Sequence, residues 1–317
     1  MTKSNQLVVV GGGRWSRQII LTLLNKIKIN TKIICVTDKK NIFFKKWIHN
    51  KNYKKKILLL NKIPDNYSKK SLAIICNSTK KHYSSAICAI QKNYNIFIEK
   101  PIANNSFDAK KIYYLGKKLK KKIYCSNVFR YSVYLNKIIK NISNKKIIKI
   151  KFIWHDKLNE FRYGELKKFD KKTPIYFDVL FHIFSLLNIF YKNRKICIDA
   201  VKKLTFKNDQ ALFNFKSKKI RIFLDLNRKA KKRARLIIFK ELNNTYLINF
   251  SNKFGKLSFF KNKINIYNKK FINKKSPLHL MLNKILLSIN KNKNVPNNLN
   301  ILGNLKNFKK IENIIRY

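Results

Sequence analysis

The chain has 317 residues, which at roughly 150 residues per domain predicts about two domains. Hydrophobic residues make up 45% of it and aromatic residues 13%, so a packed core is expected and a wholly disordered chain is excluded. The 73 Lys and Arg residues outnumber the 14 Asp and Glu residues, which gives a formal net charge of +59. A charge of this size would ordinarily indicate nucleic acid or an anionic membrane as a partner.

The distribution of the charge favours a different explanation. Basic runs such as Lys54–Lys56, Lys117–Lys122 and Lys231–Arg233 lie far apart, as is typical of solvated faces. Lys, Asn, Ile, Phe and Tyr are abundant whereas Gly (7) and Pro (5) are scarce, which is the composition expected from an A+T-rich genome. We therefore expect no nucleic-acid partner, and binding to nucleic acid or a membrane surface remains the competing hypothesis.

The sequence also indicates a compartment. Met1–Gln6 is polar and the apolar run after it is too short for a secretory signal. No run reaches the ~18 apolar residues of a membrane span, and the nearest, Tyr176–Tyr191, contains Asp178 and His182. The five cysteines are isolated and lack metal-site spacing: Cys35, Cys76, Cys88, Cys125 and Cys197. We expect a cytoplasmic protein with reduced core cysteines, no metal and no membrane contact.

The first 125 residues alternate short apolar runs with amphipathic stretches. The apolar runs are predicted to be buried strands: Leu7–Val10, Ile33–Val36, Ile57–Leu60, Leu72–Cys76, Ile96–Ile98 and Ile123–Val128. The amphipathic stretches are predicted to be helices: Trp15–Ile27, His82–Gln91 and Ser106–Lys121. Strands that alternate with helices at this spacing indicate a doubly wound α/β domain with a parallel sheet, which we assign to residues 1–125.

After residue 125 the pattern changes to strands with short polar connections. The predicted strands are Ile147–Trp154, Ile196–Leu204, Leu212–Phe215, Ile220–Leu226, Leu236–Phe239, Tyr246–Phe250, Leu257–Phe260 and Ile264–Tyr267. One apolar helix, Phe177–Phe190, interrupts them, and helices at Pro277–Asn290 and Leu302–Ile315 close the chain. This succession predicts an α+β domain over residues 126–317 with a large, mostly antiparallel open sheet. An exposed sheet face invites pairing, so a homo-oligomer through this sheet is expected.

The first predicted strand runs into three consecutive glycines and then into a helix. Gly11 permits a tight turn, and Gly13 lets the backbone approach a pyrophosphate at the helix N-terminus. Three of only seven glycines stand here, and Ser16, at the place of the third glycine of the dinucleotide-binding pattern, is small enough for close helix packing. The turn predicts a Rossmann-type domain. Its expected cofactor-binding residues are Gly11, Gly12, Gly13, Arg14 and Trp15.

Asp38 stands at the end of the second predicted strand, 22 residues past Ser16. A carboxylate there can accept hydrogen bonds from both ribose hydroxyls and would repel a 2′-phosphate. Asp38 therefore favours NAD as the cofactor, while the neighbouring Lys39 and Lys40 leave NADP open.

Two later segments carry a family resemblance. Leu72–Ala103 (LAIICNSTKKHYSSAICAIQKNYNIFIEKPIA) resembles the fourth- and fifth-strand region of the glucose–fructose oxidoreductase, inositol dehydrogenase and rhizopine catabolism family, above all in Glu99-Lys100-Pro101. Tyr176–His182 (YFDVLFH) resembles the D-x-x-x-H motif of that family, and the segment from Ser276 to Ile315 is similar to its terminal helices. The chain departs from the family pattern at three positions: Ser16, Phe181 and Ser185.

The resemblance covers nearly the whole chain and implies an NAD(P)-dependent oxidoreductase. The expected substrate is a polyol, sugar or sugar derivative, oxidised or reduced at a hydroxyl or carbonyl carbon. The implied cofactor contacts beyond the turn and Asp38 are Asn77, Ser78, Glu99 and Lys100.

Lys100, Asp178 and His182 are the candidate catalytic residues. Lys100 follows a strand at the edge where open parallel sheets bind ligands, so its ammonium group could hydrogen-bond the reacting oxygen or relay its proton. Asp178 and His182 are four residues apart on one helix face. The resemblance implies that His182 transfers the proton and that Asp178 orients the substrate or the imidazole, and an unshifted histidine pKa suits that task. Lys100 and His182 are expected to converge on one nicotinamide ring.

The other candidates have weaker support. Glu99 is interpreted as a structural strand-end carboxylate as well as a cofactor contact, and His82 as structural. The residues that could line a substrate pocket, by neighbourhood alone, are Tyr131, Trp154, Arg162 and Tyr163. The alternatives to a dehydrogenase are an imine-reducing member of the same family, a non-catalytic cofactor-binding sensor, and a basic nucleic-acid-binding protein.

Overall fold

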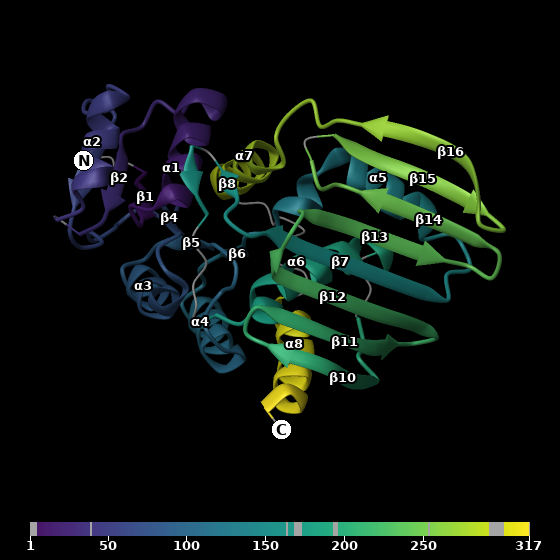
Figure 1. The fold of residues 1–317 in the computed structure, drawn as a ribbon. Coiled ribbons are helices and arrows are strands. Elements are labelled where there is room, and N and C mark those ends of the chain that lie inside the picture. The colour runs from purple at the N-terminus through teal and green to yellow at the C-terminus, as the bar shows by residue number, and fades with distance from the viewer. Residues whose placement is uncertain are drawn as a thin grey trace. The chain divides into compact units, whose positions relative to one another are not determined.

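The computed structural model describes residues 5–38, 40–162, 164–167, 173–192, 196–252, 254–291 and 301–316. The chain forms two compact units. Unit 1 comprises Met1–Asn127 and Leu278–Leu302, and unit 2 comprises Val128–Pro277 and Gly303–Tyr317. Figure 1 shows the helices and strands of both units.

Unit 1 is built on a parallel six-stranded sheet. Its strands lie in the order β3 (Ile57–Leu60), β2 (Ile33–Val36), β1 (Leu7–Val10), β4 (Leu72–Ile75), β5 (Asn95–Ile98) and β6 (Ile123–Cys125). Every neighbouring pair is parallel. The order reverses between β1 and β4, so the carboxyl ends of these strands flank the switch point where open α/β sheets bind ligands. The predicted doubly wound sheet is confirmed.

Helices follow the strands of unit 1. They are α1 (Arg14–Leu21), which continues as the π-helical turn Thr22–Ile27, then α2 (Ile42–Asn50), α3 (Thr79–Gln91), α4 (Ser106–Lys118) and α7 (Pro277–Asn290). Although α7 comes late in the chain, it belongs to unit 1, where the Ser288 and Tyr124 hydroxyls are 3.2 Å apart. The central strands β1, β4 and β5 are buried at every position, which explains why they read as continuous apolar runs.

Unit 2 is built on an eight-stranded sheet. The order is β10 (Ala200–Lys207), β11 (Gln210–Ser217), β12 (Ile220–Ala230), β7 (Lys149–Lys157), β13 (Ala234–Lys240), β14 (Asn244–Asn249), β15 (Gly255–Lys261) and β16 (Ile264–Phe271). The β12–β7 pair is parallel and all other neighbours are antiparallel. The predicted large, mostly antiparallel sheet is confirmed. A short hairpin, β8 (Phe161–Arg162) and β9 (Glu165–Leu166), stands apart from it.

The helical elements of unit 2 are the 3₁₀ turn η2 (Val128–Tyr131), α5 (Val133–Ile142), α6 (Ile175–Phe190) and α8 (Ile301–Arg316). Every residue of α6 except Asp178 is buried, as expected of a helix that is apolar all round. Phe308 of α8 contacts the rings of Phe177, Phe181 and Phe184. The covered face of the sheet and these two helices form the core of unit 2.

Two further findings bear on the sequence interpretation. Among the described residues, no helix has the length and apolar character needed to cross a membrane.

The prediction that all five cysteines are core residues is wrong for Cys197, which is exposed, and Cys88 is only half-buried. Ile196 and Ile198 on either side are buried, so the extended chain turns Cys197 outward.

Candidate cofactor and catalytic site

The glycine turn of unit 1 leaves no room for a side chain at Gly11. Its φ of +132° lies in a region that favours glycine, and a Cβ atom there would lie 2.8 Å from Ser16 Oγ and 2.9 Å from Asn77 N. Ser16 is fully buried, and its hydroxyl accepts a bond of 3.3 Å from the Cys76 thiol. Ser16 thus fills the narrow space between α1 and β4 that the third glycine of the pattern would leave open.

Gly12 and Gly13 differ in their surroundings. A Cβ atom on Gly12 would overlap the side chains of Asn41 and Thr37, whereas one on Gly13 would meet no atom of the described residues within 4 Å. Gly13 is the N-cap of α1 and has an extended backbone. Backbone N–H groups at a helix N-terminus, next to open space and aligned with the helix dipole, fit the pyrophosphate of a dinucleotide.

Asp38 lies just beyond β2 and is exposed. One of its carboxylate oxygens accepts a 2.8 Å hydrogen bond from the backbone N–H of Lys40, which fixes the side chain beside the turn. A carboxylate at this position fits the ribose hydroxyls of the adenosine half. Lys39 lies outside the described residues.

The loop after β4 carries Asn77 and Ser78, the N-cap of α3. Asn77 Nδ2 donates to Ser85 Oγ at 2.8 Å, whereas its Oδ1 atom is buried without a hydrogen-bond partner in the part of the chain that the structure describes. A buried acceptor of this kind normally has a partner. Asn77 therefore fits a ligand that brings a donor to this edge of the sheet.

His82 connects the loops after β4 and β5. Its Nδ1 atom is 2.7 Å from the Pro101 carbonyl oxygen, and its Nε2 atom is 3.1 Å from that of Asn77. Burial lowers the pKa of His82, although these two carbonyl contacts act in the opposite direction. The ring thereby links the segment that holds Lys100 to the segment that holds Asn77.

Glu99 and Lys100 follow β5 directly. Glu99 is 7% exposed, and its burial raises its pKa, an effect partly offset by the Trp15 indole, the Ser126 hydroxyl and Lys100. The backbone N–H of Lys100 donates to Glu99 Oε2 at 3.3 Å, and the Lys100–Pro101 peptide is cis. Lys100 itself is half-buried.

Unit 1 therefore places the predicted cofactor residues along one edge of its sheet. Backbone bonds continue the ladder past the strand ends, from Gly11 N to Val36 O, from Cys76 N to Val10 O and from Glu99 N to Ile75 O. The residues on or just beyond this edge are Gly11, Gly12, Gly13, Arg14, Trp15, Asp38, Asn77, Ser78, Glu99 and Lys100.

In unit 2, His182 is enclosed by aromatic rings. Its imidazole stacks on the Trp154 indole, with ring centres 5.1 Å apart and planes at 18°, and meets the edge of Phe129 at 4.8 Å. The residue is 7% exposed. Trp154 belongs to the covered face of β7, so the sheet supports one side of the imidazole and η2 supports another.

Asp178 occupies the first turn of α6, four residues before His182, and contacts a buried arginine. Arg228 Nη2 lies 3.5 Å from Asp178 Oδ2, and Arg228 Nη1 donates to the Thr173 carbonyl oxygen at 2.6 Å. The Arg228 side chain is 3% exposed and that of Asp178 is 28% exposed, so the contact joins a buried guanidinium to a carboxylate that is partly open to solvent.

A second charged group adjoins Trp154. The Arg235 guanidinium carbon lies 4.2 Å from the Trp154 ring centre, and Arg235 and Lys167 both contact the Asp156 carboxylate. Burial would raise the pKa of Asp156, but the two cations more than offset it, so the pKa lies below its usual range. Burial lowers the pKa of Lys167 to about 8 despite the attraction of Asp156.

The sequence analysis missed Arg228, Arg235 and Asp156. A usable signal was present in the strands: Ile222, Leu224 and Leu226 alternate as core residues, and Arg228 is the next residue on the same face. Asp156 continues the series of Phe152 and Trp154 in the same way. A charged side chain in register with a buried apolar face predicts a buried ion pair.

The remaining pocket candidates have different outcomes. Trp154 contacts His182 directly, and Arg162 pairs with Glu160 at 3.0 Å in the small hairpin. Tyr131 ends η2, and Tyr163 lies outside the described residues. Lys100 belongs to unit 1 whereas Asp178 and His182 belong to unit 2, so their convergence stays a prediction.

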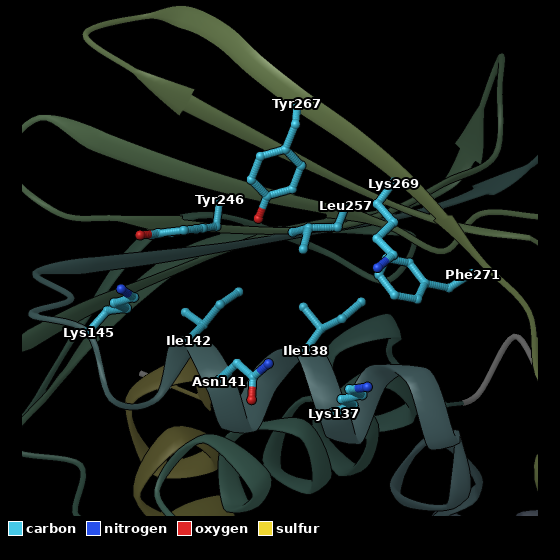
Figure 2. A pocket seen from close by; sticks show the side chains of 10 residues that line it. All are labelled: Lys137, Ile138, Asn141, Ile142, Lys145, Tyr246, Leu257, Tyr267, Lys269 and Phe271. Atoms are coloured by element: carbon cyan, nitrogen blue, oxygen red, sulfur yellow. The ribbon is translucent and has the colours of Figure 1, made fainter.

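A separate hollow of about 420 Å³ lies in unit 2 between α5 and the strands β14–β16 (Figure 2). Ile138, Leu257 and Phe271 give it an apolar wall, and Tyr267 and Lys269 extend toward it from β16. None of the sequence-predicted site residues lines it. Because lysine is abundant throughout the chain, its basic lining carries no specific signal, and we assign it no role in the chemistry.

Comparison with known proteins identifies the first part of the chain. Residues 6–127 match the family model described as an oxidoreductase family with an NAD-binding Rossmann fold. No curated protein matches the chain.

Solved structures share the fold of nearly the whole chain. UDP-N-acetylglucosamine 3-dehydrogenase GnnA from Acidithiobacillus ferrooxidans is 12% identical with a TM-score of 0.72, covering 98% of this chain and 96% of its own. A dehydrogenase (MviM) from Clostridium difficile is 15% identical with a TM-score of 0.72, and the match covers 98% of this chain and 100% of the dehydrogenase. A mutant of KijD10, a 3-ketoreductase from Actinomadura kijaniata in complex with TDP-benzene and NADP, is 7% identical with a TM-score of 0.71. This match covers 98% of this chain and 97% of the ketoreductase.

The family match covers the glycine turn, Asp38 and the Glu99-Lys100-Pro101 segment, and the fold likeness extends over both units. The predictions of family, fold class and nicotinamide cofactor are thereby confirmed. Residues 6–127 match the oxidoreductase family with an NAD-binding Rossmann fold, and the chain is an NAD(P)-dependent enzyme.

Proposed function

We propose that the chain transfers a hydride between NAD(H) and a hydroxyl or carbonyl carbon of a polyol, sugar or sugar derivative. The observation that carries the proposal is the clustering of Gly13, Asp38, Asn77 and Lys100 at the carboxyl edge of the sheet in unit 1. Two proteins of the same fold, one named as a dehydrogenase of a sugar nucleotide and the other as a ketoreductase, support the substrate class.

The cofactor residues follow from the geometry of that edge. The open space at Gly13 would take the pyrophosphate, and the Asp38 carboxylate would accept bonds from the ribose hydroxyls. Asp38 would repel a 2′-phosphate, so NAD is preferred over NADP in this proposal. When bound at this edge, the nicotinamide would supply the hydride acceptor for oxidation and the hydride donor for reduction.

The chain supplies the proton chemistry. The Lys100 ammonium group hydrogen-bonds the reacting oxygen of the substrate. During oxidation the His182 imidazole takes up the proton of the substrate hydroxyl, and during reduction it returns that proton to the substrate oxygen. Asp178 orients the substrate or the imidazole from one helical turn away. A histidine suits this transfer because its ordinary pKa lies close to neutrality.

The direct test of the reaction is a turnover screen with NAD⁺ over polyols, sugars and sugar nucleotides, followed by Lys100→Ala. Loss of the ammonium group should lower kcat by about 10²- to 10⁴-fold, while the cofactor Kd stays within about threefold, because Lys100 acts on the substrate oxygen. Lys117→Ala, at an exposed position in the last turn of α4, is the matched control and should keep the wild-type rate.

Two outcomes would overturn parts of this proposal. Turnover of Lys100→Ala at the wild-type rate would remove Lys100 from the chemistry. Tight NADH binding without turnover of any hydroxyl, carbonyl or imine substrate would identify a cofactor-binding sensor instead, whereas turnover of cyclic imines alone would identify an imine reductase.

We further propose that the chain forms a homo-oligomer through the sheet of unit 2. The face turned away from α6 carries half-exposed apolar side chains on its central strands, among them Ile153, Leu236, Ile238 and Leu247. Apolar side chains that adjoin one another on a sheet face are typical of protein–protein contacts.

A further inference from the structure

The first turn of α6 is bound by an arginine that reaches it from the sheet. On β12, the core residues Ile222, Leu224 and Leu226 alternate with outward residues, and Arg228 is the next member of the inward series. Its side chain is 3% exposed although it carries a charge. Burying a guanidinium destabilises the fold unless its N–H groups are hydrogen-bonded or paired with a negative charge. The partners of Arg228 therefore indicate its role.

Two contacts join Arg228 to the start of α6. Its Nη1 atom donates to the Thr173 carbonyl oxygen at 2.6 Å, just before the N-cap Pro174, and its Nη2 atom lies 3.5 Å from Asp178 Oδ2. The backbone of Arg228 is itself fixed, because its N–H donates to the Asp209 carbonyl oxygen at 2.8 Å. One side chain thus contacts both the chain entering the helix and the carboxylate of its first turn.

The use of arginine at this position is informative in a lysine-rich chain. Only 10 of the 73 Lys and Arg residues are arginines, and Arg228, Arg233 and Arg235 stand together on β12, β13 and the turn between them. A guanidinium can hold a carbonyl oxygen and a carboxylate at once in a fixed fork, whereas an ammonium group is a point charge on a flexible stem. The contact at Arg228 is of the kind that lysine cannot reproduce.

We propose that Arg228 is a positioning residue that acts through Asp178. It holds the Asp178 carboxylate in one orientation next to His182, the residue one turn farther along α6 that stacks on Trp154. This inference rests on the proposed function, because it assigns the purpose of the contact to proton transfer at His182. Arg228 itself touches neither the substrate nor the cofactor in this proposal.

The test uses Arg228→Met, Arg228→Lys, Asp178→Asn and the double variant Arg228→Met/Asp178→Asn in the full chain. Arg228→Met should lower kcat by about 100-fold, as expected for a misplaced catalytic group, and leave the NAD⁺ KM within about twofold. In the Asp178→Asn background the same change should lower kcat much less, because the effect of Arg228 on the chemistry passes through that carboxylate. Arg228→Lys should recover part of the loss, since it keeps the charge but not the fork.

Arg221 provides a matched control, because it is an exposed arginine on the same strand. Arg221→Met should keep the wild-type kcat. Losses at Arg228 and Asp178 that multiply in the double variant, or an Arg228→Met enzyme with unchanged kcat, would overturn the proposal.

A second measurement separates this inference from the proposed function. If the wild-type chain turns over no substrate, the proposed function fails. The Arg228–Asp178 contact is then tested by urea unfolding of the wild type, Arg228→Met, Asp178→Asn and the double variant. Coupling predicts that the loss in unfolding midpoint of the double variant is smaller than the sum of the two single losses. A midpoint loss equal to that sum would reject the contact itself, whatever the enzyme does.

Discussion

At Gly13 the space around the α-carbon is open, in contrast to the two glycines before it. Side chains at Gly11 and Gly12 would collide with Ser16, Asn41 or Thr37, so those two positions are set by the fold. At Gly13 no atom in the part of the chain that the structure describes requires glycine. The absence of a side chain there is explained by a ligand whose anionic group approaches the start of α1.

Replacing Gly13 by Ala therefore tests binding separately from folding. The backbone of Gly13 is in the extended region that alanine also adopts, so Gly13→Ala should cost at most about 1 kcal/mol of stability at this N-cap. Its methyl group should weaken NADH binding by about tenfold or more. Thermal unfolding and calorimetric titration measure the two effects, and wild-type NADH affinity in a folded Gly13→Ala protein would contradict this interpretation of the turn.

The residues that the sequence could predict are those with a local pattern. The glycine turn, Asp38 and the Glu99-Lys100-Pro101 segment are each recognisable within a few residues, and the spacing of Asp178 and His182 is one helical turn. The partners that position Asp178 and His182 come from other strands. Arg228 and Trp154 are 50 and 28 residues away in the chain, so only the sheet register brings them to α6.

Among the elements, β7 shows how one strand serves both the core and the site. Ile150, Phe152 and Trp154 face the covered side of the sheet, and Asp156 follows them in the same series at 2% exposure. Arg235 reaches Asp156 from the adjacent strand β13, and Lys167 reaches it from beyond the small hairpin. The indole that supports His182 is therefore anchored beside a buried ion pair.

Asp156→Asn should destabilise unit 2 in a pH-dependent way. Removing the carboxylate from this buried ion pair costs about 3 kcal/mol, because the buried Arg235 guanidinium would keep its charge without a partner. Since the folded pKa of Asp156 is lowered, its contribution is fully present above the unfolded value of about 3.9 and is lost as the pH falls through the lower folded value.

Urea unfolding of the wild type and Asp156→Asn between pH 3 and 7 measures this contribution. The two stabilities should differ by a constant amount above pH 5 and converge toward pH 3. A difference that persists unchanged at pH 3 would show that the carboxylate charge is not what stabilises this strand.

Elements were predictable where an apolar run or a helical period was long. The strands of both sheets and the helices α6, α7 and α8 fall at or within a few residues of the predicted ranges. Two helices were missed: α2, in which only Phe44 and Ile48 are buried, and α5, which lies next to the change from one unit to the other. The narrow buried face of α2 gives too few apolar positions for a helical period to be recognised.

For the molecule as a whole, the charge of +59 opposes close association, whereas the apolar face of the unit 2 sheet favours it. Leu236 and Ile238 on β13 and Leu247 on β14 lie half-exposed on that face. If this face is the subunit interface, burial of these side chains must overcome repulsion between two strongly basic chains. Association should therefore strengthen with added salt.

Leu236→Lys should turn the oligomer into a monomer, because it places a charge at the centre of the apolar face. Light scattering coupled to size-exclusion chromatography measures the mass, and Leu119→Lys, at an exposed position after α4 in unit 1, should leave it unchanged. A wild-type chain that runs as a monomer in both low salt and about 1 M salt, where the Debye length is ~3 Å, would contradict the proposed interface.

The central claim is that the carboxyl edge of the unit 1 sheet is a nicotinamide-cofactor site that prefers NAD. The most direct test is calorimetric titration of the purified chain with NADH and, separately, NADPH at physiological salt. The account predicts saturable, one-to-one binding of NADH that is tighter than that of NADPH, because Asp38 accepts ribose hydroxyls and repels a phosphate. No heat of binding for either cofactor at millimolar concentration would contradict it.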